Sequence, residues 1–129
     1  MKDEDPVAGE GASTPAGFTV EVRSVPGTDT VVLSVAGELD RDTMPPLSAA
    51  LEEHVGAGRV VVDCSALAFC DSSGLNALLR ARLWALEGGG TVEFSGLRPP
   101  VDRMFDVTGV RAIFRVYETL DEALDESAP

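Results

Sequence analysis

Hydrophobic positions along the chain follow two periods, and the change from one to the other predicts the order of elements. Residues 18–25 alternate between apolar and polar, and residues 30–37 are β-branched and apolar. The turn-forming cluster Pro26-Gly27-Thr28-Asp29 separates them, so the two segments are predicted to form a β-hairpin. Further apolar runs predict strands at 59–64, 91–95 and near 113–117, and the first of these is typical of a buried parallel strand.

Helical spacing occupies the segments between these strands. A first helix carries an apolar stripe at positions 47, 50, 51 and 55, with Thr43 expected to cap it through its hydroxyl and Gly56 and Gly58 expected to stop it. Pro99 is expected to open a helix that Gly109 ends, and a short acidic helix should follow at 119–126. The longest helix is expected over about 73–87, on the apolar stripe Leu75, Leu78, Leu79, Leu83 and Leu86.

Strands that alternate with helices predict an α/β fold, a mixed and mostly parallel sheet of about five strands with helices packed on it. The 129 residues are enough for one domain. Residues 1–17 are rich in small, polar and acidic residues and lack apolar periodicity, so we expect a disordered acidic leader there. The domain is then expected over 18–126, with a short tail at 127–129.

The charge balance narrows the classes of partner. Ten Lys and Arg residues against 22 acidic residues give a net charge of −12, which would repel nucleic acid and anionic membrane surfaces. Residues 1–17 hold one Lys against four acids and residues 118–129 hold five acids, which leaves −4 for residues 18–117. A basic protein surface is therefore the favoured partner. With neither a signal peptide nor an apolar run long enough to span a bilayer, a cytoplasmic location is expected.

Residues that bind metals or act as bases are scarce. Cys64 and Cys70 do not make a disulfide framework, and the single histidine, His54, cannot complete a typical zinc site with them. We expect buried thiols and no metal or cofactor. His54 has no obvious partner, so a structural role is favoured over that of a catalytic base.

The segment Asp71-Ser72-Ser73-Gly74-Leu75 lies at the junction between a strand-like run and the longest helix. An Asp or Ser oxygen there is expected to accept the free N–H groups of the first turn. The same N–H groups and the helix dipole favour phosphate. A serine at this position could therefore accept a phosphoryl group without unfolding the helix.

Four motifs in order carry a family resemblance: Gly37-Glu38-Leu39-Asp40 with Thr43, then Phe69-Cys70-Asp71-Ser72-Ser73-Gly74-Leu75, then Gly89-Gly90, then the stretch from Val101 to Val110. Together they resemble the STAS domain of bacterial anti-sigma factor antagonists over about residues 18–126. The resemblance implies a STAS-like fold and a binding function in which the unphosphorylated antagonist docks onto an anti-sigma factor and frees the sigma factor.

The resemblance also implies how the binding is regulated. The anti-sigma factor is a serine kinase with a histidine-kinase-like ATPase fold, and it phosphorylates the first serine after the aspartate, here Ser72. Phosphorylation releases the antagonist, and a metal-dependent serine phosphatase resets it. A phosphate at Ser72 would add about −1.5 to −2 charges beside Asp71, and it would oppose docking of a partner that buries the patch.

The positions that match the family motifs give the expected partner-binding site. Ser72 matches the phosphoacceptor, Asp71 and Asp40 match acids near it, Ser73 matches a small hydroxyl residue and Gly74 a position of close approach. Glu38 is expected at the same sheet edge. Asn76 and Arg80 depart from the small residues often found in the family, and with Trp84 they form one stripe at i, i+4 and i+8. Partner contact and a core-edge tryptophan beside a solvated arginine remain alternatives for this stripe.

Two other functions remain open. The chain could be a STAS scaffold, or a subunit of a larger stress-signalling or lipid-transport complex, in which Ser72 only caps the helix. A small hydrolytic site of Asp40, Asp71 and Ser72 would lack a histidine or lysine base to activate the serine, so a non-enzymatic function is expected.

Overall fold

A computed structural model describes residues 17–126. It contains a five-stranded sheet in the order β1-β2-β3-β4-β5. The strands are β1 (Phe18–Ser24), β2 (Thr30–Leu39), β3 (Arg59–Cys70), β4 (Thr91–Ser95) and β5 (Arg115–Tyr117). β1 pairs with β2 antiparallel, as the predicted hairpin requires, and the other three pairs are parallel. The expected mixed, mostly parallel sheet is thus confirmed. The expected leader, except Gly17, and the expected tail lie outside the described residues.

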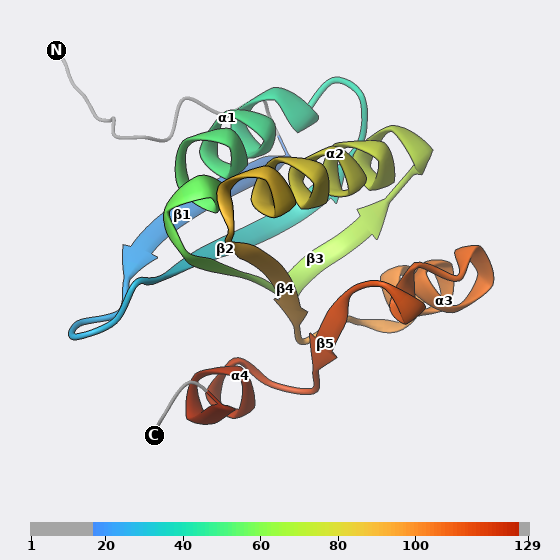
Figure 1. Ribbon diagram of the computed structural model, residues 1–129. Helices are drawn as coiled ribbons and strands as arrows, with labels where there is room; N and C mark the ends of the chain where they lie inside the picture. The colour runs from blue at the N-terminus through green and yellow to red at the C-terminus, as the bar shows by residue number, and fades with distance from the viewer. Residues whose placement is uncertain (1–16, 127–129) are drawn as a thin grey trace, which may run out of the picture.

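The helices are divided between the two faces of the sheet (Figure 1). They are α1 (Met44–His54), α2 (Ser72–Gly88), α3 (Pro99–Thr108) and α4 (Leu120–Glu126), and the short 3-10 turns η2 (Val55–Ala57) and η3 (Val110–Ala112) connect them to strands. Neighbouring strand residues point to opposite faces. Val60 and Val62 accordingly pack into the main core beneath α1, α2 and α3, whereas Val61 packs against Tyr117 and Ala123 on the face that α4 covers.

Pro and Gly bound α3 as predicted. The helix begins at Pro99, and Gly109 follows it with φ of 79°, a left-handed conformation that glycine adopts without strain. Its Phe105 packs edge-on against Phe94 of β4, with 5.4 Å between the ring centroids. This contact anchors α3 on the same face of the sheet as α1 and α2.

Two expected strand boundaries were wrong, and part of the apolar stripe on α2 is not buried. β3 runs to Cys70 rather than Cys64. It continues to pair with β2 after its pairing with β4 has ended at Asp63. Leu83 and Leu86 of α2 do not face the core; they are 57% and 60% exposed. Alanines take the inward positions and let the helix approach the sheet closely. Ile113 precedes β5 and is 47% exposed.

Candidate functional site

The carboxyl ends of β2 and β3 lie side by side and bring two acidic residues together. Leu39 pairs with Cys70 at the end of the parallel ladder. Just beyond it, the Asp71 N–H donates a 3.1 Å hydrogen bond to the carbonyl oxygen of Leu39. Asp40 and Asp71, the residues that follow the two strands, line one open hollow of about 300 Å³. We call this the acidic hollow; its lining residues are Asp40, Arg41, Asp42, Asp71 and Ser73.

Asp71 caps α2, as the sequence indicated. Its backbone is extended, and its Oδ1 accepts a 3.0 Å hydrogen bond from the N–H of Gly74. A Cβ on Gly74 would lie 2.8 Å from Cγ of Leu39 and 2.9 Å from Sγ of Cys70. Only glycine therefore lets the first turn of α2 sit this close to the ends of both strands.

The loop after β2 is held by Asp40 and Thr43. Asp40 Oδ1 accepts hydrogen bonds from the N–H groups of Asp42 and Thr43, at 2.9 and 3.0 Å. The expectation that the Thr43 hydroxyl caps the first helix was wrong, since it makes no capping bond. It instead donates to the carbonyl oxygen of Glu38 at 2.8 Å and accepts from the Asp40 N–H at 2.8 Å. Thr43 is buried, so this local network fixes the loop that carries Asp40 and Arg41.

The two serines differ in their surroundings. Ser72 is the first residue of α2 and is exposed, and its hydroxyl has no hydrogen-bond partner within residues 17–126. Ser73 is half-buried and lines the acidic hollow. Neither hydroxyl is hydrogen-bonded to a base in this part of the chain. Within residues 17–126, neither serine therefore has the partner that would activate it as a nucleophile.

The other expected site residues separate into two groups. Glu38 is exposed and pairs in register with Phe69, one step from the end of β2. Asn76 and Arg80 are also exposed, on the first turns of α2. Trp84 is half-buried and packs against the main core, which agrees with its interpretation as a core-edge residue. The expected stripe along α2 is thus exposed over its first two members only.

Both thiols of β3 are buried, Cys70 at this edge of the sheet and Cys64 earlier in the strand. Burial, and then the charge of Asp71, raise the pKa of Cys70 to about 12. Burial also raises the pKa of Cys64, which lies deeper in the core. Each side chain therefore stays a neutral thiol and packs as a small apolar group.

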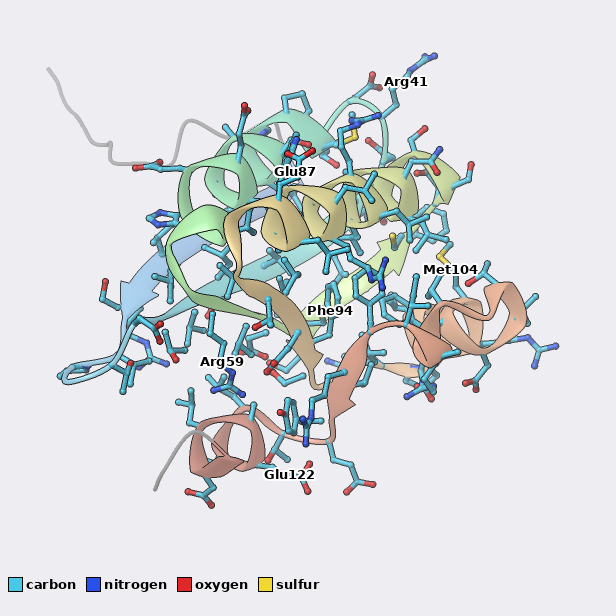
Figure 2. All side chains as sticks on the ribbon, in the orientation of Figure 1. Arg41, Arg59, Glu87, Phe94, Met104 and Glu122 are labelled. Carbon is cyan, nitrogen blue, oxygen red and sulfur yellow. The ribbon has the colours of Figure 1, made fainter. Side chains whose placement is uncertain are left out.

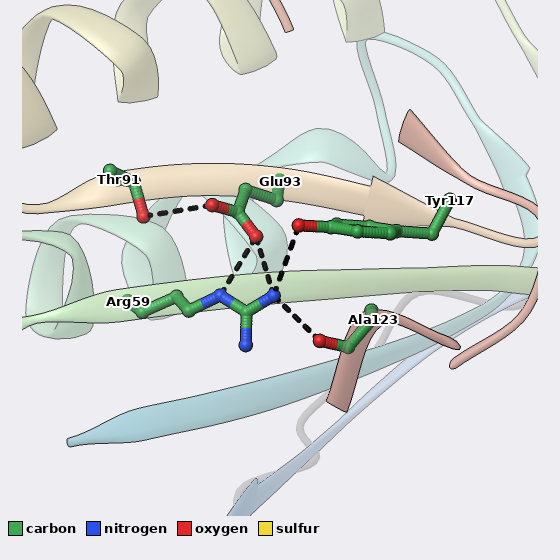
Figure 3. A network of polar contacts seen from close by, with 5 residues as sticks. All are labelled: Arg59, Thr91, Glu93, Tyr117 and Ala123. Atoms are coloured by element: carbon green, nitrogen blue, oxygen red, sulfur yellow. Dashed lines mark hydrogen bonds and ion pairs between the residues drawn. The ribbon is translucent and has the colours of Figure 1, made fainter. Parts of the chain in front are cut away.

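A second polar cluster, which the sequence did not indicate, lies on the opposite face beneath α4 (Figure 3). The Arg59 guanidinium donates from Nε to Glu93 Oε1 at 2.8 Å, and its Nη2 lies 2.7 Å from the same oxygen. Nη2 also donates to the carbonyl oxygen of Ala123 at 2.8 Å and contacts the Tyr117 hydroxyl at 3.4 Å. We call these four residues the Arg59 network. Their mutual contacts indicate a structural role.

Within residues 17–126, no group of three or more His, Cys, Asp or Glu side chains is arranged to hold a metal ion. None of the helices in this range combines the length and apolar character needed to cross a bilayer.

Comparisons with known proteins agree on one family. The family model described as "Mlab, STAS domain" matches residues 24–118. An "Anti-sigma F factor antagonist" from Paenibacillus polymyxa is 28% identical over 99 residues, which cover 74% of this chain and 85% of the relative. The crystal structure of an anti-sigma factor antagonist from Mycobacterium paratuberculosis is 32% identical, has a TM-score of 0.76, and covers 88% of this chain and 97% of its own.

A further solved structure, the Bacillus cell fate determinant SpoIIAA in its phosphorylated form, superposes with a TM-score of 0.67 at 22% identity. It covers 84% of this chain and 99% of that chain. At this identity the likeness concerns the fold.

Proposed function

The chain belongs to the STAS domain family, and from this membership we propose that it is an anti-sigma factor antagonist that phosphorylation of Ser72 switches off. The observation that carries the proposal is the position of Ser72. It is exposed as the first residue of α2, directly after the capping aspartate, with its hydroxyl unengaged within residues 17–126. A kinase can reach this hydroxyl without opening the fold.

Electrostatics at this helix end supports a two-state switch. The N-terminal N–H groups and the dipole of α2 favour a phosphate, so the modified chain keeps its fold. In a complex, the same phosphate would add its charge beside Asp71 and the acidic hollow. Burying that extra charge against a partner that already faces Asp40 and Asp71 costs binding energy.

Exposure favours Ser72 over Ser73 as the acceptor. Ser73 is half-buried and lines the acidic hollow with Asp40 and Asp71, so a phosphate there would face two carboxylates at close range. A phosphate on Ser72 projects from an exposed position, with the first turn of α2 behind it. The neighbouring carboxylates therefore oppose modification of Ser73 more strongly.

The proposed docking surface surrounds this serine. It combines the acidic hollow with exposed residues of β2 and the first turns of α2, and Trp84 contributes only at its margin. Its acidic character favours a basic partner surface. We assign the partner as an anti-sigma factor with serine kinase activity and a histidine-kinase-like ATPase fold, with a metal-dependent serine phosphatase to reverse the step. The surface comprises Glu38, Asp40, Arg41, Asp42, Asp71, Ser72, Ser73, Asn76, Arg80 and Trp84. Gly74, which the resemblance placed in the site, is buried and positions the first turn of α2.

The test uses the full chain, a cognate anti-sigma kinase and ATP. Mass spectrometry is expected to find one added phosphate, located at Ser72. The Ser73→Ala variant should still be modified, whereas Ser72→Ala should not. In a binding assay, Ser72→Ala should stay bound in the presence of ATP. Phosphorylated wild type should bind at least ~30-fold more weakly, which corresponds to about 2 kcal/mol.

Three outcomes would overturn the proposal. Phosphate confined to Ser73, or no phosphate with any kinase of this class, would remove the switch. If the partner of the chain binds phosphorylated and unphosphorylated protein equally, the function is instead that of a constitutive scaffold or complex subunit.

A further inference from the structure

The outward face of α2 carries large apolar side chains. Leu83 and Leu86 are 57% and 60% exposed, and Leu79 is half-buried beside them. At 3.6 residues per turn, these three leucines share one face of the helix. The inward face uses the small residues Ala77, Ala81 and Ala85. This arrangement places the larger apolar side chains of the C-terminal half of α2 toward the outside.

Two opposite charges border this leucine face on one side. Arg80 and Glu87 are exposed and lie seven residues apart, so nearly two helical turns place them on the same edge of the face. Neither side chain has a hydrogen bond or an ion pair within residues 17–126. Figure 2 labels Glu87 near the C-terminal end of α2.

The order of these residues is self-complementary. If two copies of α2 lie antiparallel about a twofold axis at Leu83, Leu83 meets Leu83 of the second copy. Leu79 then meets Leu86 of the second copy, and Arg80 meets Glu87 of the second copy. Each contact occurs twice, as an isologous interface requires.

We propose that the outward face of α2 is a self-association surface whose occupant is a second copy of this chain, held antiparallel. In a parallel twofold pair, the edge that carries Arg80 and Glu87 would lie against the opposite edge of the leucine face of the second copy, so the two charges could not pair. The charges therefore select the antiparallel arrangement, and the leucines supply the apolar contact. Ile113 extends the apolar area beside Leu86, across a groove of about 290 Å³.

The contact is small, which sets its strength. An interface made mainly by one helix face falls below the ~1,200–2,000 Å² of a stable complex, so we expect a dissociation constant on the order of 100 µM. Leu83 lies roughly 16 Å along the helix from Ser72, at about 1.5 Å per residue. Self-association is thus independent of the serine, although, if the proposed function holds, it would cover Arg80 of the docking surface.

Sedimentation of the full chain from about 1 µM to about 1 mM tests the proposal. Wild type should pass from monomer to dimer, and Leu83→Asp should weaken the association at least ~10-fold. Val107→Asp is the matched control, because Val107 of α3 is 74% exposed and lies outside this surface. Arg80→Glu and Glu87→Arg should each weaken the dimer, and the double variant should restore it.

A crosslink tests the position of the twofold axis at Leu83. Leu83→Cys should form a disulfide-linked dimer on mild oxidation, because the twofold axis brings the two thiols together, whereas Val107→Cys should not. The native Cys64 and Cys70 are buried and should not take part. A chain that stays monomeric to about 1 mM, or equal effects of Leu83→Asp and Val107→Asp, would overturn the proposal. Absence of phosphorylation at Ser72 would overturn the proposed function but not the proposed self-association.

Discussion

Arg59 of β3 donates a 2.8 Å hydrogen bond to the main-chain carbonyl of Ala123, in the last turns of α4. α4 has no basic residue of its own in its last turn. The guanidinium therefore supplies the positive charge that a helix C-terminus favours. Because Arg59 lies on β3 and also binds Glu93 of β4, its side chain joins β3, β4 and α4.

Replacing this arginine should cost far more stability than replacing an exposed one. The Arg59 and Glu93 side chains are only 15% and 12% exposed, so Arg59→Met would leave a buried carboxylate unpaired. We expect a loss of about 3 kcal/mol in the free energy of unfolding, measured by urea denaturation.

The control for this prediction is Arg111→Met. Arg111 also contacts two carboxylates, Asp102 and Asp106, but its side chain is 39% exposed. That variant should lose less than about 1 kcal/mol. Adding Glu93→Gln to Arg59→Met should recover part of the loss. Equal losses in the two single arginine variants would contradict the prediction.

The Arg59 network should also be visible in a pH titration of the single tyrosine. Burial first, and then the negative charge of Glu93, raise the pKa of Tyr117. The phenolate absorbance of the native protein should therefore appear above the ordinary value of about 10, whereas unfolded protein should titrate near it.

The free energy of unfolding should also depend on pH through Tyr117. A pKa raised on folding means that the contribution of neutral Tyr117 is complete below about pH 10 and is lost as the pH rises through the raised pKa. The Tyr117→Phe variant should lack this decline. A native titration midpoint at or below the ordinary value would show that the phenol is not shielded as the structure indicates.

Sequence periodicity located nearly every element because most contacts that define them are local. The hairpin at β1 and β2, the Pro99 start of α3 and the Asp71 cap all depend on residues within a few positions of one another. The second half of β3 was missed because it has only one neighbouring strand. The polar residues Asp63 and Ser65 interrupt the apolar run there, and the pattern no longer resembles a buried strand.

Two other features could not be predicted, and the reason is different. They are the choice of which α2 side chains face inward and the contacts of the Arg59 network. Leu83 and Leu86 fit a helical stripe, but the small residues Ala77, Ala81 and Ala85 occupy the inward face. Arg59 finds partners 34 and 64 positions away. Such pairs are set by strand order, which local spacing does not specify. The closeness of Asp40 and Asp71 was expected from the family resemblance and from the shared sheet edge, but the hollow between them was not.

Because α2 lies close to the strand ends, alanine should be tolerated at Gly56 but not at Gly74. Gly74→Ala would place a Cβ 2.8 Å from Cγ of Leu39, whereas Gly56→Ala meets nothing within 4 Å. We expect Gly74→Ala to lose about 1–3 kcal/mol of unfolding free energy despite the better helix propensity of alanine. Gly56→Ala should stay within about 0.5 kcal/mol of wild type. Thermal unfolding of the two variants checks this, and a neutral Gly74→Ala would mean that the first turn of α2 can shift.

The two roles assigned to Asp71, helix cap and charged neighbour of Ser72, can be separated by two substitutions. Asp71→Asn keeps an oxygen that can accept from the Gly74 N–H, so stability should change by only a few tenths of a kcal/mol. Asp71→Ala removes the cap and should lose about 1 kcal/mol of unfolding free energy. Binding of the unphosphorylated chain to a basic partner surface should weaken in both variants and become less sensitive to salt, because each removes the same charge. If Asp71→Asn binds like wild type while only Asp71→Ala is impaired, the carboxylate acts through the helix alone and its charge has no part in recognition.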